Sequence, residues 1–506
     1  MHPTPTAPSR IPTGVPGLDD VLFGGLVRGG FYLLQGDPGA GKTTLALQFA
    51  RGRVAAGESC LYITLTETHR DLADAAASHG WTLDGIDLCD LTRTAPNRVG
   101  EPDTSIFHPS ETELGETTQA ILAAVDRVRP RHLIFDGLSE MRLMAGEPLV
   151  YRRQLLALKE FCAERGLTVL VLDDRAAAFG ALPAESLVGG NIILERSLPV
   201  YGRARRRLHV TKVRGSSFRE GYHDYEIAQG GLVVYPRLVA AEHHVTFERR
   251  THPSGVRNLD AMLAGGLTSG STTLFLGPAG SGKSTVAMQY VVSAMRAGLP
   301  AAVYMFDEVL DTLFRRVEKL CAVGEGGLRG FKERGLLHAQ QVDPAELTPG
   351  AFTHEVCRAV DAGARVVVID SLNGYLNAMP EERFLTTHLH ELFSYLNQKG
   401  VVTLFVLAQH GMLASSSLPG DVDVSYLADT VLLFRYFEAR GEIQQAVSVF
   451  KKRTGAHERT LRQMRISSSG IAVGEPLREF RGVMTGVPLF DGEAGLLRAP
   501  EGQDQD

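Results

Sequence analysis

The sequence predicts an α/β fold made of two tandem lobes, each a mainly parallel sheet flanked by helices. Two observations predict it: the chain of 506 residues repeats itself in one register, and short apolar runs alternate with longer amphipathic stretches in both copies. Fully apolar runs fit strands that are buried on both faces, and amphipathic stretches fit the helices that cover them. A sheet of this kind is typically parallel.

The internal repeat is clearest near the start of each copy. The segment at 13–30, TGVPGLDDVLFGGLVRGG, returns at 254–271 as SGVRNLDAMLAGGLTSGS. The segment at 36–44, GDPGAGKTT, returns at 277–285 as GPAGSGKST, and both pairs are offset by the same 241 positions. A repeat of this length is too long for a solenoid unit and has the size of a domain.

We therefore expect three parts in the chain. The first lobe covers 1–240 and the second covers 241–486, with the linker near 236–252. The remaining tail at 487–506 is short, polar and acidic. We expect this tail to be disordered because it has little apolar surface to bury.

Within each lobe the expected strands follow one another in the same order. In the first lobe we expect a helix at 149–165 and strands in FYLLQ, CLYITLT, HLIFD, LTVLVLD and NIILERS. The second lobe offers TTLFLG, AAVYMF, RVVVID, VVTLFVLA and DTVLLF. After the last of these strands both lobes continue into polar hairpin segments, at 205–215 and at 446–455.

Charge and cysteine usage exclude several classes of protein. A formal net charge of −6 provides no overall basic field, which argues against a nucleic acid or an anionic membrane as partner. The five cysteines are scattered and form no CxxC, which argues against a disulfide framework and a zinc site. The longest apolar runs, such as 401–408, are too short to span a bilayer. We expect a cytoplasmic protein.

The repeated glycine-rich segment predicts ATP binding in both lobes. Each copy fits GxxxxGK[ST], follows an expected strand and opens an expected helix, and this context makes the pattern specific. Such a loop turns successive backbone N–H groups towards a polyphosphate. Lys42 and Lys283 would reach the outer phosphates, and Thr43 and Ser284 would offer hydroxyls to Mg²⁺. The expected nucleotide contacts are Gly39, Ala40, Gly41, Lys42, Thr43 and Thr44 in the first lobe, and Gly280, Ser281, Gly282, Lys283, Ser284 and Thr285 in the second.

Acidic residues at strand ends complete each candidate site. Asp136 in HLIFD and Asp370 in RVVVID are candidate ligands for Mg²⁺ and its water shell. Glu67, Asp307 and Glu308 follow the second strand of their lobes, at the sheet edge where ligands bind, and are candidate general bases. The alternatives are an aspartate that caps a turn and acids that favour a helix N-terminus.

These residues resemble the KaiC family within the RecA-like ATPases, over roughly residues 10–485. The resemblance rests on the doubled lobes, the entry GLDDVLFGGL, the two P-loops, and the segment ADTVLLFRYFEARGEIQQAVSVFKKR, which is specific to the family. It implies two RecA-like lobes that bind ATP and Mg²⁺ between the subunits of a two-tiered homo-hexameric ring. It also implies slow ATP hydrolysis in the first lobe and serine/threonine autophosphorylation in the second, with KaiB-like or other signalling proteins as partners.

The family pattern has two adjacent glutamates after the second strand of the first lobe. Here Thr66 stands at the first of these positions and Glu67 at the second. In the second lobe the pair reads Asp307 and Glu308. The resemblance therefore implies general-base function in the second lobe most directly.

The resemblance also implies cations that act across a subunit boundary. The segment KVRGSS matches the family stretch that reaches the γ-phosphate of a neighbouring subunit, which assigns this role to Lys212 and Arg214. The matching residues of the second lobe are Lys451 and Arg453 in KKRTG.

The segment DVSYLADT at 423–430 matches the family segment with adjacent phosphorylated residues, which places Ser425 at the first acceptor and Tyr426 at the second. The leading hypothesis is a signalling ATPase that phosphorylates itself at Ser425. The alternatives are a kinase-inactive ATPase scaffold switched by its nucleotide and a RecA-like DNA motor, which the acidic composition disfavours.

Overall fold

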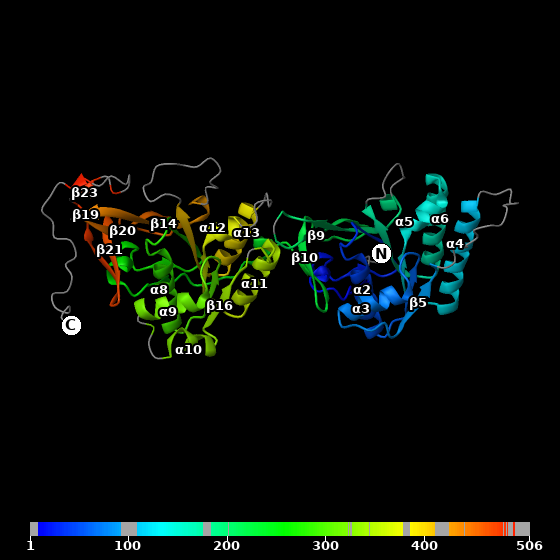
Figure 1. Cartoon of the computed structure of the whole chain (residues 1–506), viewed down its shortest axis with the longest axis horizontal. Coiled ribbons are helices and arrows are strands. Elements are labelled where there is room, and N and C mark those ends of the chain that lie inside the picture. The colour runs from blue at the N-terminus through cyan, green and yellow to red at the C-terminus, as the bar shows by residue number, and fades with distance from the viewer. Residues whose placement is uncertain are drawn as a thin grey trace, which may run out of the picture. The chain divides into compact units, whose positions relative to one another are not determined.

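The computed structural model describes a sheet-and-helix architecture that repeats along the chain (Figure 1). The described residues are 9–92, 109–175, 184–200, 202–321, 323, 326–343, 345–377, 385–409, 425–439, 441–478, 480, 481, 483, 489 and 490. Apart from Leu489 and Phe490, the tail expected to be disordered lies outside these residues. The chain divides into two compact units, Met1–Arg237 and Leu238–Asp506.

The first unit is built on one large sheet, whose strand order over the described residues is β11-β10-β9-β8-β3-β7-β6-β4-β5. Neighbouring strands from β8 to β5 are parallel, and β8 to β11 are antiparallel. The strands are β3 (Phe31–Gly36), β4 (Cys60–Thr64), β5 (Ile86–Asp90), β6 (His132–Asp136), β7 (Thr168–Asp174), β8 (Gly190–Ser197), β9 (Arg205–Val213), β10 (His223–Ala228) and β11 (Gly231–Tyr235).

The helices of the first unit connect and cover these strands. They are α1 (Leu18–Val21), α2 (Lys42–Ala55), α3 (His69–Ser78), α4 (Pro109–Val128), α5 (Leu138–Ala145), α6 (Pro148–Glu164) and the short η2 (Ala184–Ser186). A small separate sheet pairs β1 (Arg10–Ile11) with β2 (Leu26–Val27).

The second unit repeats this topology in the order β16-β15-β17-β18-β14-β19-β20-β21-β22. The strands are β14 (Ser271–Pro278), β15 (Ala301–Met305), β16 (Leu337–Gln341), β17 (Val366–Asp370), β18 (Val402–Gln409), β19 (Thr430–Ala439), β20 (Glu442–Lys452), β21 (Leu461–Ser467) and β22 (Gly470–Pro476). The two-stranded sheets are β12 (Thr251–His252) with β13 (Leu267–Thr268), and β23 (Phe480–Arg481) with β24 (Leu489–Phe490).

The helices of the second unit occupy places like those of the first. They are η3 (Ala240–His243), α7 (Arg257–Met262), α8 (Lys283–Arg296), α9 (Leu310–Leu320), α10 (Gly327–Glu333), α11 (Pro349–Asp361), α12 (Leu372–Asn377), α13 (Leu385–Gln398) and η4 (Ser425–Leu427).

Each sheet separates two apolar clusters, so both of its faces are covered. In β3, Leu34 packs into the cluster that includes α2, and its neighbour Leu33 packs into the cluster that includes α6. The second unit shows the same division on the two sides of β14, with Phe275 on one side and Leu274 on the other. Burying one such side chain contributes about 1.5–3 kcal/mol. The expected α/β fold with two mainly parallel sheets is confirmed.

Part of the expected linker belongs to the second unit. The backbone N–H of Ala240 donates to Glu391 Oε2 at 3.1 Å, and the ring of His243 lies edge-on to Tyr395. Ala240 itself is buried in the same apolar cluster as Tyr395. The segment after Arg237 is therefore anchored to the helices of the second sheet.

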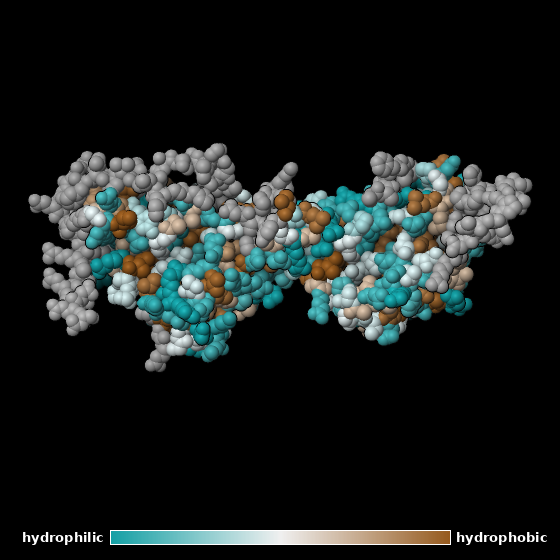
Figure 2. All heavy atoms as spheres, viewed as in Figure 1, coloured by the Kyte–Doolittle hydropathy of each residue, from teal (hydrophilic) through white to brown (hydrophobic). Residues whose placement is uncertain are grey.

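Apolar residues on the face in view lie in separate groups among hydrophilic ones (Figure 2). Within the described ranges, no helix is both long enough and apolar enough to cross a bilayer.

A charged cluster ties the start of β4 to its neighbours in the first unit. Glu58 accepts from Arg28 Nη2 at 2.8 Å and lies 2.8 Å from Nε2 of His132, which is fully buried. Burial raises the pKa of Glu58, but the hydrogen bonds from Arg28 and His132 outweigh burial and leave this pKa at about 2. Burial lowers the pKa of His132. The cluster therefore favours the ionised form of Glu58 in the folded state.

We predict that Glu58→Gln lowers the free energy of unfolding of the first unit at pH 7 by about 1–3 kcal/mol, because charged hydrogen bonds are lost. The folded pKa of Glu58 lies below its unfolded value of 4.5, so this contribution is complete above that pH. It is lost as the pH falls towards about 2, and the difference between variant and wild type should shrink accordingly.

The measurement is urea unfolding followed by tryptophan fluorescence. The only tryptophan of the chain, Trp81, is buried in the first unit, so its signal reports this unit selectively. Glu164→Gln, at a side chain that is 78% exposed, is the control and should leave stability unchanged. Equal stability of Glu58→Gln and wild type at pH 7 would contradict the prediction.

Candidate functional site

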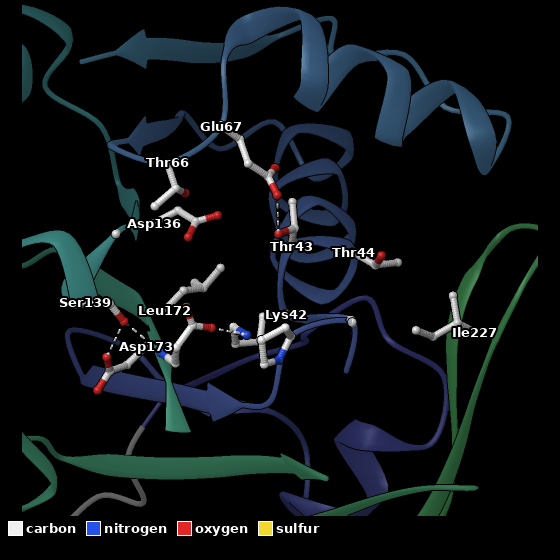
Figure 3. A pocket seen from close by; sticks show the side chains of 15 residues that line it. Lys42, Thr43, Thr44, Thr66, Glu67, Asp136, Ser139, Leu172, Asp173 and Ile227 are labelled. Carbon is white, nitrogen blue, oxygen red and sulfur yellow. Dashed lines mark hydrogen bonds and ion pairs between the residues drawn. The ribbon is translucent and has the colours of Figure 1, made fainter. Parts of the chain in front are cut away.

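A cavity of about 440 Å³ lies at the carboxyl end of the parallel strands in the first unit. The P-loop between β3 and α2 forms one wall, and the ends of β6 and β7 and the residues after β4 form the others (Figure 3). Gly41 precedes α2 with φ 98°, a left-handed conformation that favours glycine. A Cβ at this position would lie 2.6 Å from Ile227 Cδ1. The Ile227 side chain could move aside, so the positive φ is the reason that glycine is favoured here.

Lys42 projects from the first turn of α2 into this cavity. Its Nζ donates to the carbonyl oxygens of Gly36 at 2.9 Å and of Asp37 at 3.3 Å. The same atom forms an ion pair with Asp174 Oδ1 at 2.7 Å. The ammonium group thus lies where the outer phosphates of a nucleotide bind in P-loop proteins.

The expected magnesium and base residues of the first lobe converge on the same cavity. Thr43 Oγ1 donates to Glu67 Oε1 at 3.3 Å, and the Tyr62 hydroxyl donates to Asp136 Oδ2 at 2.7 Å. Burial raises the pKa of both carboxyl groups, and the charge of Asp136 raises that of Glu67 further. Thr66, at the position of the missing acid, also lines the cavity. Raised carboxyl pKa values favour proton uptake and therefore suit a general base.

The P-loop of the second unit holds its lysine in a more buried place. Lys283 is 5% exposed and donates to the carbonyl oxygen of Pro278 at 2.7 Å. Burial lowers the pKa of Lys283 to about 8, although the charge of Asp370 opposes this shift. Burial also raises the pKa of Asp370 to about 6, against a hydrogen bond from Ser284. The lysine, hydroxyl and aspartate expected from the sequence therefore interact here as well.

The two candidate base residues of the second lobe have different partners. Asp307 accepts a short hydrogen bond from the hydroxyl of Ser371, which follows β17. Glu308 forms an ion pair with Arg316 of α9, and Arg316 Nη1 also donates to Thr285 Oγ1 at 3.3 Å. Glu308 thus lies on the same side of the site as the start of α8.

The carboxylate and hydroxyl groups of both lobes fit Mg²⁺. Asp370 Oδ2 is buried and, among the described residues, has no hydrogen-bond partner, so it offers an unsatisfied oxygen. Carboxylate and hydroxyl oxygens are the hard ligands that Mg²⁺ prefers. In the described part of the chain, no group of three or more His, Cys, Asp or Glu side chains is placed to hold a metal. Most of the ligands would therefore have to come from nucleotide phosphates and water.

In the first lobe, the cations expected to act across a subunit boundary lie at the other end of their own sheet. Lys212 lies near the end of β9 and Arg214 follows this strand, where Val213 pairs with Gly190 at the start of β8. Lys212 donates to the carbonyl oxygen of Glu185, and Arg214 Nη2 donates to that of Ser186 at 3.0 Å. Since the P-loop follows the carboxyl end of β3, these cations do not meet the phosphate loop of their own lobe.

In the second lobe the cations and the candidate acceptor come together. Lys451 Nζ donates to the backbone carbonyl oxygen of Ser425 at 3.2 Å and to that of Ala428 at 2.7 Å. Arg453 lies 3.8 Å from Asp429 Oδ1, next to the amino end of β19. Tyr426 beside the acceptor is 51% exposed. This group again lies at the sheet end opposite the P-loop of the same lobe.

Sequence reasoning missed four residues of the two sites. Asp174 ends a strand in the apolar segment LTVLVLDD, and its place at the ligand edge of the sheet was the available signal. Tyr62 and Arg316 carry no local signal, because an apolar strand and an amphipathic helix each tolerate many residues at these places. Ser371 follows directly after Asp370, as a turn residue would.

Comparison with known proteins agrees with this architecture. The family model described as ATPase: KaiC matches residues 11–239 and 252–478. The Circadian clock oscillator protein KaiC of Thermosynechococcus vestitus is 26% identical over 510 residues, which cover 97% of this chain and 95% of that protein. Its namesake in Synechococcus elongatus is 25% identical, covering 95% of this chain and 92% of that protein.

Circadian clock protein KaiC3 of Synechocystis sp. is 24% identical, covering 97% of this chain and 96% of that protein. The family match thus includes both lobes and both phosphate loops. The chain belongs to the KaiC family and is an ATPase with two tandem RecA-like lobes.

Proposed function

We propose that this protein is a signalling ATPase whose second lobe phosphorylates Ser425 of a neighbouring copy, with ATP bound between the subunits of a homo-hexameric ring. The observation that carries this proposal is the placement of Lys451, Arg453 and Ser425 at one end of the sheet, opposite the P-loop of their own lobe. A second copy would supply the missing P-loop. The first lobe repeats the arrangement with Lys212 and Arg214.

The side chains of the second lobe fit transfer of the γ-phosphoryl group to a hydroxyl. Lys283 would hold the outer phosphates, and Glu308 would accept the proton that the Ser425 hydroxyl loses as its oxygen bonds to phosphorus. The bond to the β-phosphate oxygen breaks, and ADP leaves. Lys451 and Arg453 would stabilise the charge on the transferring group. Mg²⁺, held by Ser284 and Asp370, would neutralise charge on the phosphates.

The first lobe has side chains of the same kinds, and these fit hydrolysis of ATP by water. Glu67 would take a proton from the attacking water, and Thr43 with Asp136 would hold Mg²⁺. Since Thr66 replaces one of the two family acids, Glu67 acts alone, and we expect slow turnover. Signalling partners, KaiB-like proteins among them, would then respond to the nucleotide state of the ring.

A second candidate function is a nucleotide-switched ATPase scaffold without kinase activity. Two observations favour it. Tyr426 stands at the second acceptor position, and the carboxylate of Glu308 forms an ion pair with Arg316, which competes with its proposed role as a base. A tyrosine hydroxyl lies several bonds farther from the backbone than a threonine hydroxyl. On the same backbone it would therefore not lie at the position from which a threonine hydroxyl attacks the γ-phosphate.

Phosphopeptide mass spectrometry on the full chain after incubation with Mg-ATP separates the two functions. We predict phosphate at Ser425 in wild type and its loss in both Ser425→Ala and Lys283→Ala. The proposed chemistry requires both the acceptor and the second P-loop. Consumption of ATP with no phosphate at Ser425 would overturn the kinase function and leave the scaffold.

Mixed subunits test whether transfer crosses between copies. The Lys283→Ala chain lacks the lysine of the second P-loop, and the Ser425→Ala chain lacks the acceptor. Neither chain alone can therefore become phosphorylated at Ser425. We predict that mixing the two restores phosphate, and only on the Lys283→Ala chain. Light scattering with and without ATP measures the assembly alongside, and a strictly monomeric protein would contradict the arrangement.

The two shifted pKa values of the second lobe predict how nucleotide affinity depends on pH. Lys283 must be protonated to attract the phosphates and loses its proton above about pH 8. Asp370 must be ionised to hold Mg²⁺ and gains a proton below about pH 6. We therefore predict that affinity for Mg-ATP is greatest between these values and falls by up to about tenfold per pH unit on either side.

Equilibrium titration with a fluorescent ATP analogue measures this profile in a Lys42→Ala chain, where only the second lobe binds. Without Mg²⁺, the part of the acid limb that Asp370 contributes should be lost, while the part due to protonation of the terminal phosphate remains. The alkaline limb should also remain, because it depends on Lys283. An affinity that is constant from pH 5 to pH 9 would contradict the assignment.

A further inference from the structure

The two lobes differ in what faces the P-loop lysine. In the first lobe, Asp174 at the end of β7 forms an ion pair with Lys42 at 2.7 Å. Both side chains line the cavity in which the phosphates would bind. The carboxylate thus provides the kind of contact that a phosphate oxygen would otherwise make.

The position of Asp174 is fixed by its neighbours. Its backbone N–H donates to Ser139 Oγ at 3.0 Å, and this hydroxyl donates in turn to Asp173 Oδ1 at 2.9 Å. Asp173 is also paired with Arg142 and is 3% exposed. Asp173 is therefore neutralised by its own partner, which leaves Asp174 as the carboxylate that faces Lys42.

The second lobe has the same backbone arrangement without the charge. Gly36 pairs with Asp174, and Gly277, its counterpart in the repeat, pairs with Ala408. The backbone N–H of Ala408 donates to Asn373 Oδ1 at 2.7 Å, just as that of Asp174 donates to Ser139. Ala408 is therefore the structural equivalent of Asp174.

Lys283 accordingly lacks the ion pair of Lys42. Within the described ranges no carboxylate lies within ion-pair distance of Lys283, whose ammonium group donates to the Pro278 carbonyl oxygen at 2.7 Å. Among the described residues, Asp370 therefore acts on the lysine of the second lobe only through its nearby charge, while the lysine of the first lobe is in direct contact with a carboxylate.

We propose that Asp174 sets the nucleotide affinity of the first lobe by competing with the outer phosphates for Lys42. This inference rests on the proposed ATP binding of the first lobe and adds its regulation. ATP must displace the carboxylate from Lys42 and then remain beside a negative charge. The penalty is greater for ATP than for ADP, because the γ-phosphate adds charge close to the lysine.

Solvent limits the size of the effect. The Asp174 side chain is 46% exposed and that of Lys42 13%, so water and salt screen part of the repulsion. We expect Asp174→Asn, which keeps the shape and removes the charge, to tighten ATP binding about three- to tenfold. The gain for ADP should be smaller, and both gains should shrink at high ionic strength.

The measurement is energy transfer from Trp81 to a fluorescent ATP or ADP analogue in the full chain. The ring of Trp81 lies 4.8 Å from that of His79, whose Nε2 is 3.5 Å from Thr44 Oγ1. The only tryptophan of the chain therefore lies close to the first P-loop. A Lys283→Ala background removes binding at the second lobe.

The second lobe provides the reciprocal experiment. In a Lys42→Ala background, Ala408→Asp should weaken ATP binding by a similar factor, and Ala408→Asn should leave it nearly unchanged. The pair separates charge from size at a position where the backbone contacts of Asn373 remain available.

Tighter ATP binding in Asp174→Asn together with weaker binding in Ala408→Asp supports the inference. Unchanged or weaker ATP binding in Asp174→Asn overturns it, and weaker binding would assign Asp174 a favourable contact with the bound nucleotide or its metal. If the Lys283→Ala chain binds no nucleotide at all, the proposed ATP binding of the first lobe itself fails, which is a separate result.

Discussion

The direction of the strands in each sheet is the constraint on which the rest of the structure depends. Parallel strands bring all their carboxyl ends to one edge, where the backbone turns away and leaves N–H groups and side chains for a ligand. β3 and β14 end at this edge and continue into the two P-loops. The hairpins that follow β8 and β19 carry their cations to the opposite edge. A single lobe therefore holds its P-loop and its hairpin cations at opposite ends of the sheet, and the proposed function requires a second copy to bring them together.

Burial gives the two lobes different electrostatic properties although their topology is the same. In the second lobe the lysine and the aspartate are buried. Burial lowers the pKa of Lys283 and raises that of Asp370, which favours the neutral form of each group. In the first lobe the lysine is paired directly with a carboxylate, Asp174. The same loop sequence thus works in two settings. Duplication supplied the scaffold, and single residues at strand ends differentiate the copies.

The fold and the phosphate loops could be predicted from the sequence because their signals are local. The run FYLLQ, the glycines of the loop and the lysine that opens α2 lie within a dozen residues, so short-range rules suffice. Asp174 and Arg316 could not be predicted in this way. The contacts of Asp174 depend on which strand lies beside β3, and those of Arg316 depend on the side of α9 that faces Thr285. Both are features of the tertiary structure. The side of the sheet on which Lys451 meets Ser425 also follows only from strand register.

The chain after Arg237 has a consequence for exchanging lobes between relatives. Phe247 packs its ring against the backbone at Gly270 and Gly400, two glycines with positive φ, where a Cβ would lie 2.4 Å and 2.7 Å from ring atoms. Together with the contact between Ala240 and Glu391, this makes residues 238–252 a structural strap of the second sheet. In a chimera joined within this strap, part of the segment that packs on the second lobe would come from a different protein. A junction at Arg237 and Leu238 would transfer each lobe with the contacts on which its own packing depends.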